Sequence, residues 1–269
     1  RVVLAVQDTT TLNYTAHPAT QMGQIGYQAK KGIGLLLHDT MAFNAQGTPL
    51  GLMDVQCWAR DPKDFGKKKR RHELPIEQKE SNKWLVSFRR VAEAQKRCPE
   101  TTLVSVGDRE ADIYELFKLA WQDPAGPKLL VRAEQNRLLE EGQGHLWERV
   151  VGERVCGIQE IWVPRRSHRP GRVARLEIRF AKVSLKPPRR KPELGNLPIW
   201  AVLTREVDAP EGVEPLEWML LTTCEVSTFE QAVEKVAWYT LRWGIETYHR
   251  TLKSGCKIEE RQLGSADRL

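Results

Sequence analysis

The segment 238–255 carries four side chains at helical spacing that could do chemistry. Its sequence, WYTLRWGIETYHRTLKSG, places Tyr239, Arg242, Glu246 and Lys253 three, four and seven residues apart. On a helical wheel of about 100° per residue, these side chains fall within one stripe about 60° wide. Such a stripe is either a solvated charged face, in which Arg242 pairs with Glu246, or part of a site whose other members lie elsewhere in the chain.

The opposite side of the same helix is apolar and can pack on a sheet. Its members recur at intervals of four, three and four residues: Leu241, Ile245, Tyr248 and Leu252. The polar stripe then faces outward or into a cleft. Chemistry at Glu246 therefore depends on partners supplied by the rest of the chain.

Two aspartates follow apolar segments at matching places in the sequence. Asp8 comes after VVLAVQ, and Asp108 comes after LVSVG. A single aspartate after a strand is most often a turn residue or a helix cap. Ligands of mixed α/β sheets, however, collect at strand ends. Two such aspartates on neighbouring strands could therefore meet Glu246 from a helix that covers the sheet.

Three carboxylates at one place repel one another, and a hard divalent cation relieves that repulsion. Mg²⁺, or Mn²⁺ in its place, binds oxygen ligands and is commonly held by one or two carboxylates together with substrate phosphates. Two such ions about 3.5–4 Å apart can clamp an in-line phosphoryl displacement, with Asp8 bridging both. Tyr239, Arg242 and Lys253 would then hold the phosphates that do not react.

Four stretches of the chain carry a resemblance to a known family: VQDTTTLNYT around Asp8, KESNKWL at 79–85, VGDREADIYEL at 106–116, and the segment 238–255. Together they look like the DDE transposases of the IS-four insertion-sequence family, close to the transposon-five type. The spacing Tyr-x2-Arg-x3-Glu-x6-Lys in the last stretch matches the YREK motif of that family. The likeness spans nearly the whole chain.

The resemblance implies an α/β fold, in which a ribonuclease H-like mixed sheet is flanked by helices and a β-rich insertion precedes the last catalytic helix. It divides the chain into the first part of the core at 1–135, the insertion at 136–215, and the last part of the core with the YREK helix at 216–269. The implied activity is that of a cut-and-paste transposase catalytic domain, which cleaves DNA through a hairpin and carries out strand transfer.

The same resemblance assigns roles to individual residues. Asp8, Asp108 and Glu246 would be the catalytic, metal-binding triad, with two Mg²⁺ or Mn²⁺ ions as cofactors. The DNA contacts would come from Tyr239, Arg242 and Lys253 on terminal phosphates, Trp218 stacking on a base flipped during hairpin formation, and Arg132 in a lesser role. The alternative for Trp218 is a core tryptophan of a strand, and for His249 a helix-surface position is preferred to a catalytic role.

The resemblance also implies partners and a context. Transposon-end and target double-stranded DNA would be bound, the full-length protein would be a homodimer, and the location would be the bacterial cytoplasm, in association with the nucleoid. Family members carry an N-terminal end-recognition domain and a C-terminal dimerisation region, and we expect neither to lie within these 269 residues. We therefore expect the chain, which starts at Arg1 and ends in SADRL, to be a segment of a longer protein.

Two other functions fit the same residues. A structure-selective nuclease on the same core would hydrolyse DNA without rejoining it, and an inactive transposase remnant would only bind DNA. Transfer of a 3′-hydroxyl into target DNA separates a transposase from the nuclease, and the intact triad speaks against the remnant.

Apolar patterning indicates the elements that must position these residues. Strands are predicted at 1–8, 34–43, 51–59, 101–108, 128–135 and 216–223, and helices at 80–98 and 109–120. A long final helix follows an N-cap at Ser227 or Thr228. The early strands indicate an antiparallel meander, and the later alternation indicates parallel strands beside it. Gly244 should cost the final helix about 1 kcal/mol relative to Ala.

Charge and composition narrow the class of protein. The 269 residues have a net charge of +7, which favours polyanionic partners and above all nucleic acid. Basic residues gather at 67–71 and between Arg165 and Lys191, where eleven Lys or Arg stand against one acid. No apolar run approaches the roughly 20 residues of a membrane span, so no membrane partner is expected. The five cysteines lack CxxC spacing, which favours reduced thiols in a cytoplasmic protein.

Overall fold

The structure, a computed structural model, describes residues 1–17, 22–26, 32–61, 74–140, 142–165 and 170–261. The strands are β1 (Val2–Asn13), β2 (Gly23–Gln24), β3 (Ile33–Asn44), β4 (Pro49–Trp58), β5 (Thr102–Gly107), β6 (Lys128–Arg132), β7 (Gly157–Val163), β8 (Arg172–Leu185), β9 (Leu197–Val207) and β10 (Glu217–Thr222). Within the described residues they form one mixed sheet in the order β2-β3-β1-β5-β6-β10-β9-β8-β7, and β4 also pairs with β3. The expected α/β class is confirmed.

The first half of the sheet has the strand order of a ribonuclease H-like core. β1 pairs antiparallel with β3, and β3 pairs antiparallel with β4, which is the predicted meander. β5 then lies parallel to β1, and β6 lies parallel to β5. Three antiparallel strands followed by two parallel ones therefore give the order β4-β3-β1-β5-β6.

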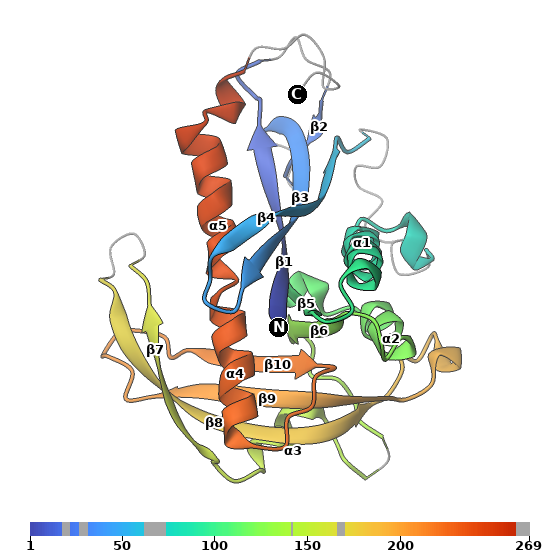
Figure 1. Ribbon diagram of the computed structural model, residues 1–269, viewed down its shortest axis with the longest axis vertical. Coiled ribbons are helices and arrows are strands. Elements are labelled where there is room, and N and C mark those ends of the chain that lie inside the picture. Colours follow the sequence, from blue (N-terminus) through green and yellow to red (C-terminus); the bar gives the residue numbers. More distant parts are fainter. Residues whose placement is uncertain (18–21, 27–31, 62–73, 141, 166–169, 262–269) are drawn as a thin grey trace.

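Three strands within the predicted insertion 136–215, β7, β8 and β9, continue the same sheet, and they join the first half through β10, which follows the insertion. β10 pairs antiparallel with β6 on one side and with β9 on the other, and β8 and β7 follow in antiparallel order. Figure 1 shows these long strands crossing the lower part of the molecule. The insertion also contains the short helix α3 (Leu146–Val151), which the sequence pattern did not indicate.

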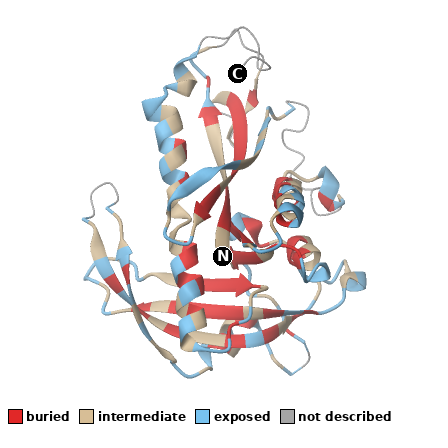
Figure 2. Cartoon of the chain, viewed as in Figure 1, coloured by how far each residue is buried: buried red, intermediate tan, exposed pale blue. Residues whose placement is uncertain are grey.

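Helices cover both faces of the sheet and bury its apolar side chains (Figure 2). α1 (Asn82–Arg97) and α2 (Tyr114–Gln122) pack on one face, where Leu129 and Val131 of β6 point. α4 (Phe229–Thr240) and α5 (Trp243–Arg250) pack on the other face, where Leu130 points. This alternation follows from the two-residue period of a strand. No helix among the described residues is long and apolar enough to cross a membrane.

The final helical region consists of α4 and α5, and it is not the single helix that the periodicity predicted. It begins as expected at Thr228, which forms a capping box with Gln231. At the junction, the amides of Leu241 and Arg242 donate to carbonyls three residues back instead of four. Because this tighter turn rotates more per residue, a wheel drawn for an ideal α-helix does not hold across it. A π-helical turn, Thr251–Gly255, follows α5.

Gly244 lies where α5 crosses β3. A Cβ placed on Gly244 would come within 2.7 Å of Cε1 of Phe43, a buried side chain of β3. The glycine therefore allows α5 to approach the sheet closely, which compensates its low helix propensity. This close approach brings Glu246 to the sheet.

The shorter helical turns are η3 (Ile76–Gln78), η4 (Arg109–Ala111), η5 (Pro192–Leu194) and η7 (Ile258–Glu260). Of these, η4 matters for the site, because it begins directly after Asp108.

Candidate active site

Asp8 and Asp108 lie side by side where β1 and β5 part. Asp8 does not end its strand as predicted, because β1 runs on to Asn13 through the β-branched threonines at 9–11 and stays paired with β3. The parallel pairing of β1 with β5, however, ends at Val6 and Val106. Each aspartate therefore follows the last parallel pair by two residues.

Asp108 is held by the turn that follows it. Its Oδ1 accepts a hydrogen bond of 2.9 Å from the backbone amide of Glu110, so that Asp108 caps η4. Burial raises the pKa of Asp108, and the nearby carboxylate of Asp8 raises it further, against the opposing effect of the amide and of Arg242. The Asp108 carboxylate thus lies in an environment that favours a nearby positive charge.

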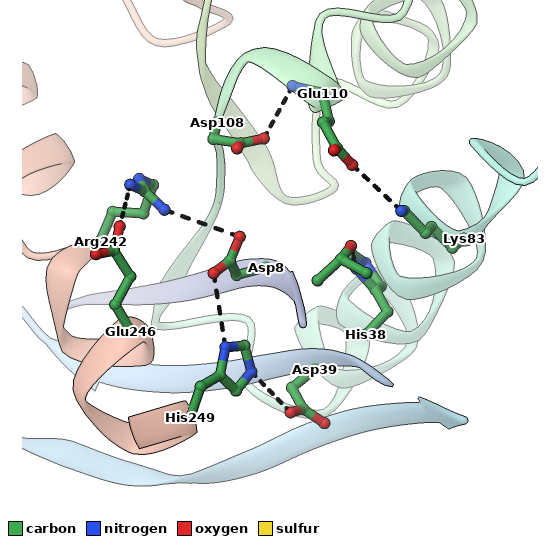
Figure 3. A network of polar contacts seen from close by, with 10 residues as sticks. Asp8, His38, Asp39, Lys83, Asp108, Glu110, Arg242, Glu246 and His249 are labelled. Carbon is green, nitrogen blue, oxygen red and sulfur yellow. Dashed lines mark hydrogen bonds and ion pairs between the residues drawn. The ribbon is translucent and has the colours of Figure 1, made fainter. Parts of the chain in front are cut away.

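The guanidinium of Arg242 lies among the three predicted carboxylates (Figure 3). Its Nη2 donates to Oε1 of Glu246 at 2.5 Å, and its Nη1 lies 3.9 Å from Oδ1 of Asp8. Burial lowers the pKa of Arg242, but Tyr239, Asp8, Glu246 and Asp108 together outweigh burial and the pKa is raised. The structure therefore brings the three acids together around one buried cation.

The donor set suits a hard divalent cation, although Glu246 is turned toward Arg242. All three carboxylates offer oxygen atoms, which are the ligands that Mg²⁺ and Mn²⁺ prefer. In the part of the chain that the structure describes, no group of three or more His, Cys, Asp or Glu is arranged to hold a metal ion. Positive charge at this place is supplied by Arg242, so Glu246 would have to leave Arg242 to join a metal site.

His249 and Asp39 also belong to this site, and neither was predicted from the sequence. Nε2 of His249 lies 3.0 Å from Oδ2 of Asp39, and Nδ1 lies 3.6 Å from Oδ2 of Asp8. The expected surface position of His249 is wrong, because its side chain is buried between α5 and the sheet. Burial lowers the pKa of His249, but the hydrogen bonds and charges of Asp39 and Asp8 outweigh burial and the pKa is raised.

Two signals in the sequence could have pointed to this pair. His249 stands three residues after Glu246, which places both on neighbouring parts of one helix face. Asp39 is the single acid in the apolar run 34–43, and a buried carboxylate requires a partner. What the sequence could not supply is the strand register, in which Asp39 lies opposite Asp8.

Aromatic and basic side chains adjoin the carboxylates on the α4 side. Tyr239 is buried, which raises its pKa, while Arg242 and Arg132 beside its hydroxyl act in the opposite direction. Its ring packs edge-on against Trp218, with centroids 5.2 Å apart, and Trp218 meets Trp243 at 6.2 Å. Four of the predicted DNA-binding residues, Tyr239, Arg242, Arg132 and Trp218, are therefore neighbours.

Trp218 and Lys253 are placed differently from the other predicted DNA contacts. Trp218 is only 4% exposed and belongs to the core under α4, so a base could stack on it only after a neighbouring side chain moves. Lys253 is half-buried in the turn after α5, about 10 Å along the axis from Glu246. Within the described residues no hydrogen bond or ion pair engages Lys253. The DNA roles of both residues stay predictions.

A cleft of about 490 Å³ opens beside Arg132. Two more arginines line it, Arg109 from the turn after Asp108 and Arg205 from β9. Each is partly neutralised, because Arg109 lies 3.4 Å from a Glu134 oxygen and Arg205 lies 2.8 Å from a Glu217 oxygen. Three glutamates, Glu206, Glu214 and Glu217, line the same cleft. The cleft begins next to the carboxylate site, because Arg109 directly follows Asp108 in the chain, and its lining combines acids with bases.

Two acids that follow Asp108, Glu110 and Asp112, hold the elements around the site in place. The buried carboxylate of Asp112 accepts hydrogen bonds from the guanidinium of Arg137 and from two backbone amides of the loop after β6. Glu110 forms an ion pair of 3.3 Å with Lys83 of α1. These contacts tie three elements together around the turn that carries Asp108.

The described part of the second basic run gives less to a DNA surface than its composition suggested. The run at 67–71 lies outside the described residues, as do residues 166–169 of the second run. In the described part of the second run, four cations already face an acid: Arg172 with Glu206, Arg175 with Asp208, Arg179 with Glu177, and Lys191 with Glu115. This stretch is therefore not a continuous basic face.

No model of a known protein family matches the chain. Among solved structures, the chain has a distant similarity to a piggyBac transposase, determined by cryo-EM as a synaptic complex with hairpin DNA. The two share 11% sequence identity with a TM-score of 0.43, over 94% of this chain and 40% of that chain. The chain thus spans less than half the length of that transposase, and no residue role is transferred from it.

Proposed function

We propose that the chain is the catalytic core of a DNA transposase, which cleaves DNA strands and joins their ends to a target. One observation carries the proposal: Asp8, Asp108 and Glu246 converge around one guanidinium where the inner strands β1 and β5 of a ribonuclease H-like sheet part. The motif contexts of these three acids, which resemble the DDE triad of the IS-four family, support it.

Asp8, Asp108 and Glu246 would hold the divalent cations. When bound, Mg²⁺ or Mn²⁺ would supply activation of the attacking oxygen and stabilisation of the leaving oxygen at the scissile phosphate. The chain contributes two ligands next to paired strands, where their positions are well fixed. The third, Glu246, has a side chain 44% exposed on α5 and is free to turn from Arg242 toward the other two acids.

Arg242 exchanges its partners in this proposal. In the protein alone it neutralises the carboxylates, whereas a divalent cation among them would repel its like charge. DNA phosphates then offer its planar fork new acceptors. Because Arg242 is largely buried beside Tyr239, it stays at the site during the exchange. We expect Arg242 to bind a phosphate next to the scissile one, with the Tyr239 hydroxyl donating to the same backbone.

Transposon-end and target double-stranded DNA are the proposed partners. The arginines of the cleft, Arg109, Arg132 and Arg205, would contact the DNA backbone, although Glu206, Glu214 and Glu217 line the same cleft. The hairpin intermediate, the homodimer of the full-length protein and the cytoplasmic, nucleoid-associated location rest on the family resemblance.

The test is the metal-dependent chemistry of the 269-residue chain on labelled DNA. We expect nicking of duplex DNA with Mg²⁺ or Mn²⁺, no nicking in a metal chelator, and transfer of a pre-cleaved 3′-hydroxyl end into a plasmid. Asp108→Asn should lower both rates roughly 10²–10³-fold, the usual loss when one electrostatic group is removed from a phosphoryl- or acyl-transfer site. DNA affinity should change little, since the basic surface is intact.

Asp123→Asn is the matched control, because it makes the same substitution at an exposed position at the end of α2. Its nicking and transfer rates should equal those of the wild type. Near-normal metal-dependent cleavage by Asp108→Asn would contradict the proposal. Nicking without any transfer of the 3′-hydroxyl would favour the structure-selective nuclease.

A further inference from the structure

We infer that His249, held by Asp39, is a positioning residue that fixes which oxygen of Asp8 faces the cation site. The inference rests on the proposed function, in which Asp8 is a metal ligand. The two oxygens of Asp8 face different groups (Figure 3). Oδ1 faces Nη1 of Arg242 at 3.9 Å, on the side of Asp108 and Glu246, whereas Oδ2 faces Nδ1 of His249 at 3.6 Å.

His249 is itself fixed from its other side. Its Nε2 lies 3.0 Å from Oδ2 of Asp39, which stands opposite Asp8 in the β1–β3 register. The ring therefore bridges two acids on neighbouring strands, and it cannot turn without losing one of them. The packing of α5 on the sheet leaves His249 only 5% exposed.

Among the described residues, the carboxylate of Asp39 has no structural role other than its contact with His249. It is fully buried within an apolar strand, and its Oδ1 has no hydrogen-bond partner among them. A buried carboxylate with an unsatisfied oxygen destabilises the folded state. Its one described polar contact is His249, so we assign Asp39 the task of orienting the imidazole.

The physical need for such a device follows from the torsions of aspartate. The carboxylate of Asp8 turns about χ2, a broad torsion that does not by itself select one oxygen. A charged partner held near one oxygen, as Nδ1 of His249 is at 3.6 Å from Oδ2, leaves the other oxygen for the metal. Groups that orient metal ligands in this way typically change metal affinity by about 10–100-fold when they are removed.

Two amide substitutions at position 249 separate a role in positioning Asp8 from a role in packing the core. The amide nitrogen of Asn lies close to where Nδ1 of histidine lies, and that of Gln lies close to Nε2. His249→Asn therefore keeps a donor toward Asp8 and loses the donor to Asp39. His249→Gln keeps the donor to Asp39 and loses the one toward Asp8.

The measurements are the affinity of the 269-residue chain for Mn²⁺ alone, by isothermal titration calorimetry without DNA, and the Tm of the metal-free chain. We expect His249→Gln to weaken Mn²⁺ binding by about 10–100-fold while its Tm stays near that of the wild type. His249→Asn should keep its Mn²⁺ affinity and melt at a lower temperature, because Asp39 is left unpaired. His145→Gln, at an exposed position, should change neither.

Mn²⁺ affinity of His249→Gln equal to that of the wild type would overturn the inference. So would affinities that fall in step with Tm in both variants, because a purely structural role predicts that parallel. Asp8→Asn separates the inference from the proposed function. If Asp8→Asn abolishes Mn²⁺ binding and His249→Gln leaves it unchanged, only the positioning role fails. If Asp8→Asn leaves Mn²⁺ binding unchanged, the proposed function fails and the positioning role fails with it.

Discussion

Arg242 and His249 supply the positive charge that lets several acids lie close together on the sheet. Each bridges two carboxylates, Arg242 between Asp8 and Glu246, and His249 between Asp8 and Asp39. Both side chains are largely buried. Burial lowers the pKa of each, but Tyr239 and the carboxylates outweigh burial at Arg242, and the carboxylates outweigh it at His249, so both pKa values are raised. Asp8 is common to the two bridges, so its carboxylate links the cation site to the interior of the sheet.

A second histidine, His38, makes folding stability depend on pH. Burial, followed by the charges of Lys83 and His249, lowers its pKa from 6.5 to about 3. Between these values the unfolded chain binds the extra proton, so this contribution makes stability rise with pH from about 3 to 6.5 and leaves it unchanged above 6.5. The expected loss for the wild type between pH 7 and pH 5 is about 2 kcal/mol from this group.

Urea unfolding at pH 7, 6 and 5 measures this dependence. His38→Gln should lose that part of the pH dependence, whatever its stability at pH 7, because it has no titrating ring between Thr9 and Gln7. His145→Gln, exposed in the insertion, is the matched control and should keep the slope of the wild type. Parallel pH profiles for the wild type and His38→Gln would contradict the buried, neutral state of His38.

At the scale of elements, the crossing of α5 over β3 depends on Gly244. Alanine at this position gains about 1 kcal/mol in helix propensity, but its Cβ would overlap the buried ring of Phe43. Overpacking of this kind costs about 1–3 kcal/mol. We therefore expect Gly244→Ala to lower the free energy of unfolding by up to about 2 kcal/mol, measured by urea denaturation.

Gly255→Ala is the matched glycine substitution in the same helical region. Its Cβ would meet only Cγ2 of Thr251 at 3.4 Å, so we expect it to be neutral or slightly stabilising. A Gly244→Ala variant that is more stable than the wild type would mean that Phe43 yields easily, and that the glycine is not needed for the approach of α5.

Local sequence pattern predicted the elements well where the local signal was strong. The strands around Ala42, Val104 and Leu130 follow from short apolar runs, and the start of α4 follows from its capping box. The break between α4 and α5 was missed because Thr240–Arg242 contains neither Gly nor Pro. The tighter hydrogen bonds there coincide with the packing of Leu241 and Trp243 on the core, and contacts between distant segments of this kind leave no local pattern in the sequence.

At the scale of the whole molecule, the features that the sequence could not supply are pairings between distant segments. Asp39 joins the site through the β1–β3 register, and the insertion joins the core sheet through the pairing of β10 with β6 and β9. The ion pairs of the basic run 165–191 could not be predicted for the same reason. Arg172 pairs with Glu206, and Lys191 pairs with Glu115, and both acids are distant in the sequence. Composition predicted the charges but not their partners.

The ion pairs formed in the folded chain determine which basic side chains we expect to bind DNA. The net charge of +7 favours a polyanion, and each phosphate contact that releases a counterion contributes about −0.9 to the slope of log affinity against log salt. Arg132 lies at the cleft beside Tyr239 and forms no ion pair among the described residues, and its Nη2 donates to the carbonyl oxygen of Glu217 at 2.9 Å. Arg175, in the basic run, already lies 3.1 Å from a carboxylate oxygen of Asp208.

We therefore expect Arg132→Gln to weaken binding of a labelled duplex and to reduce the magnitude of the salt slope by about 0.9. Arg175→Gln removes the same charge and should leave the slope unchanged, which makes it the matched control. Fluorescence anisotropy titrations at several salt concentrations measure both slopes. A reduction of the slope by Arg175→Gln as large as that by Arg132→Gln would mean that Arg175 leaves Asp208 to bind a phosphate and releases a counterion. The DNA-binding surface would then extend over β8.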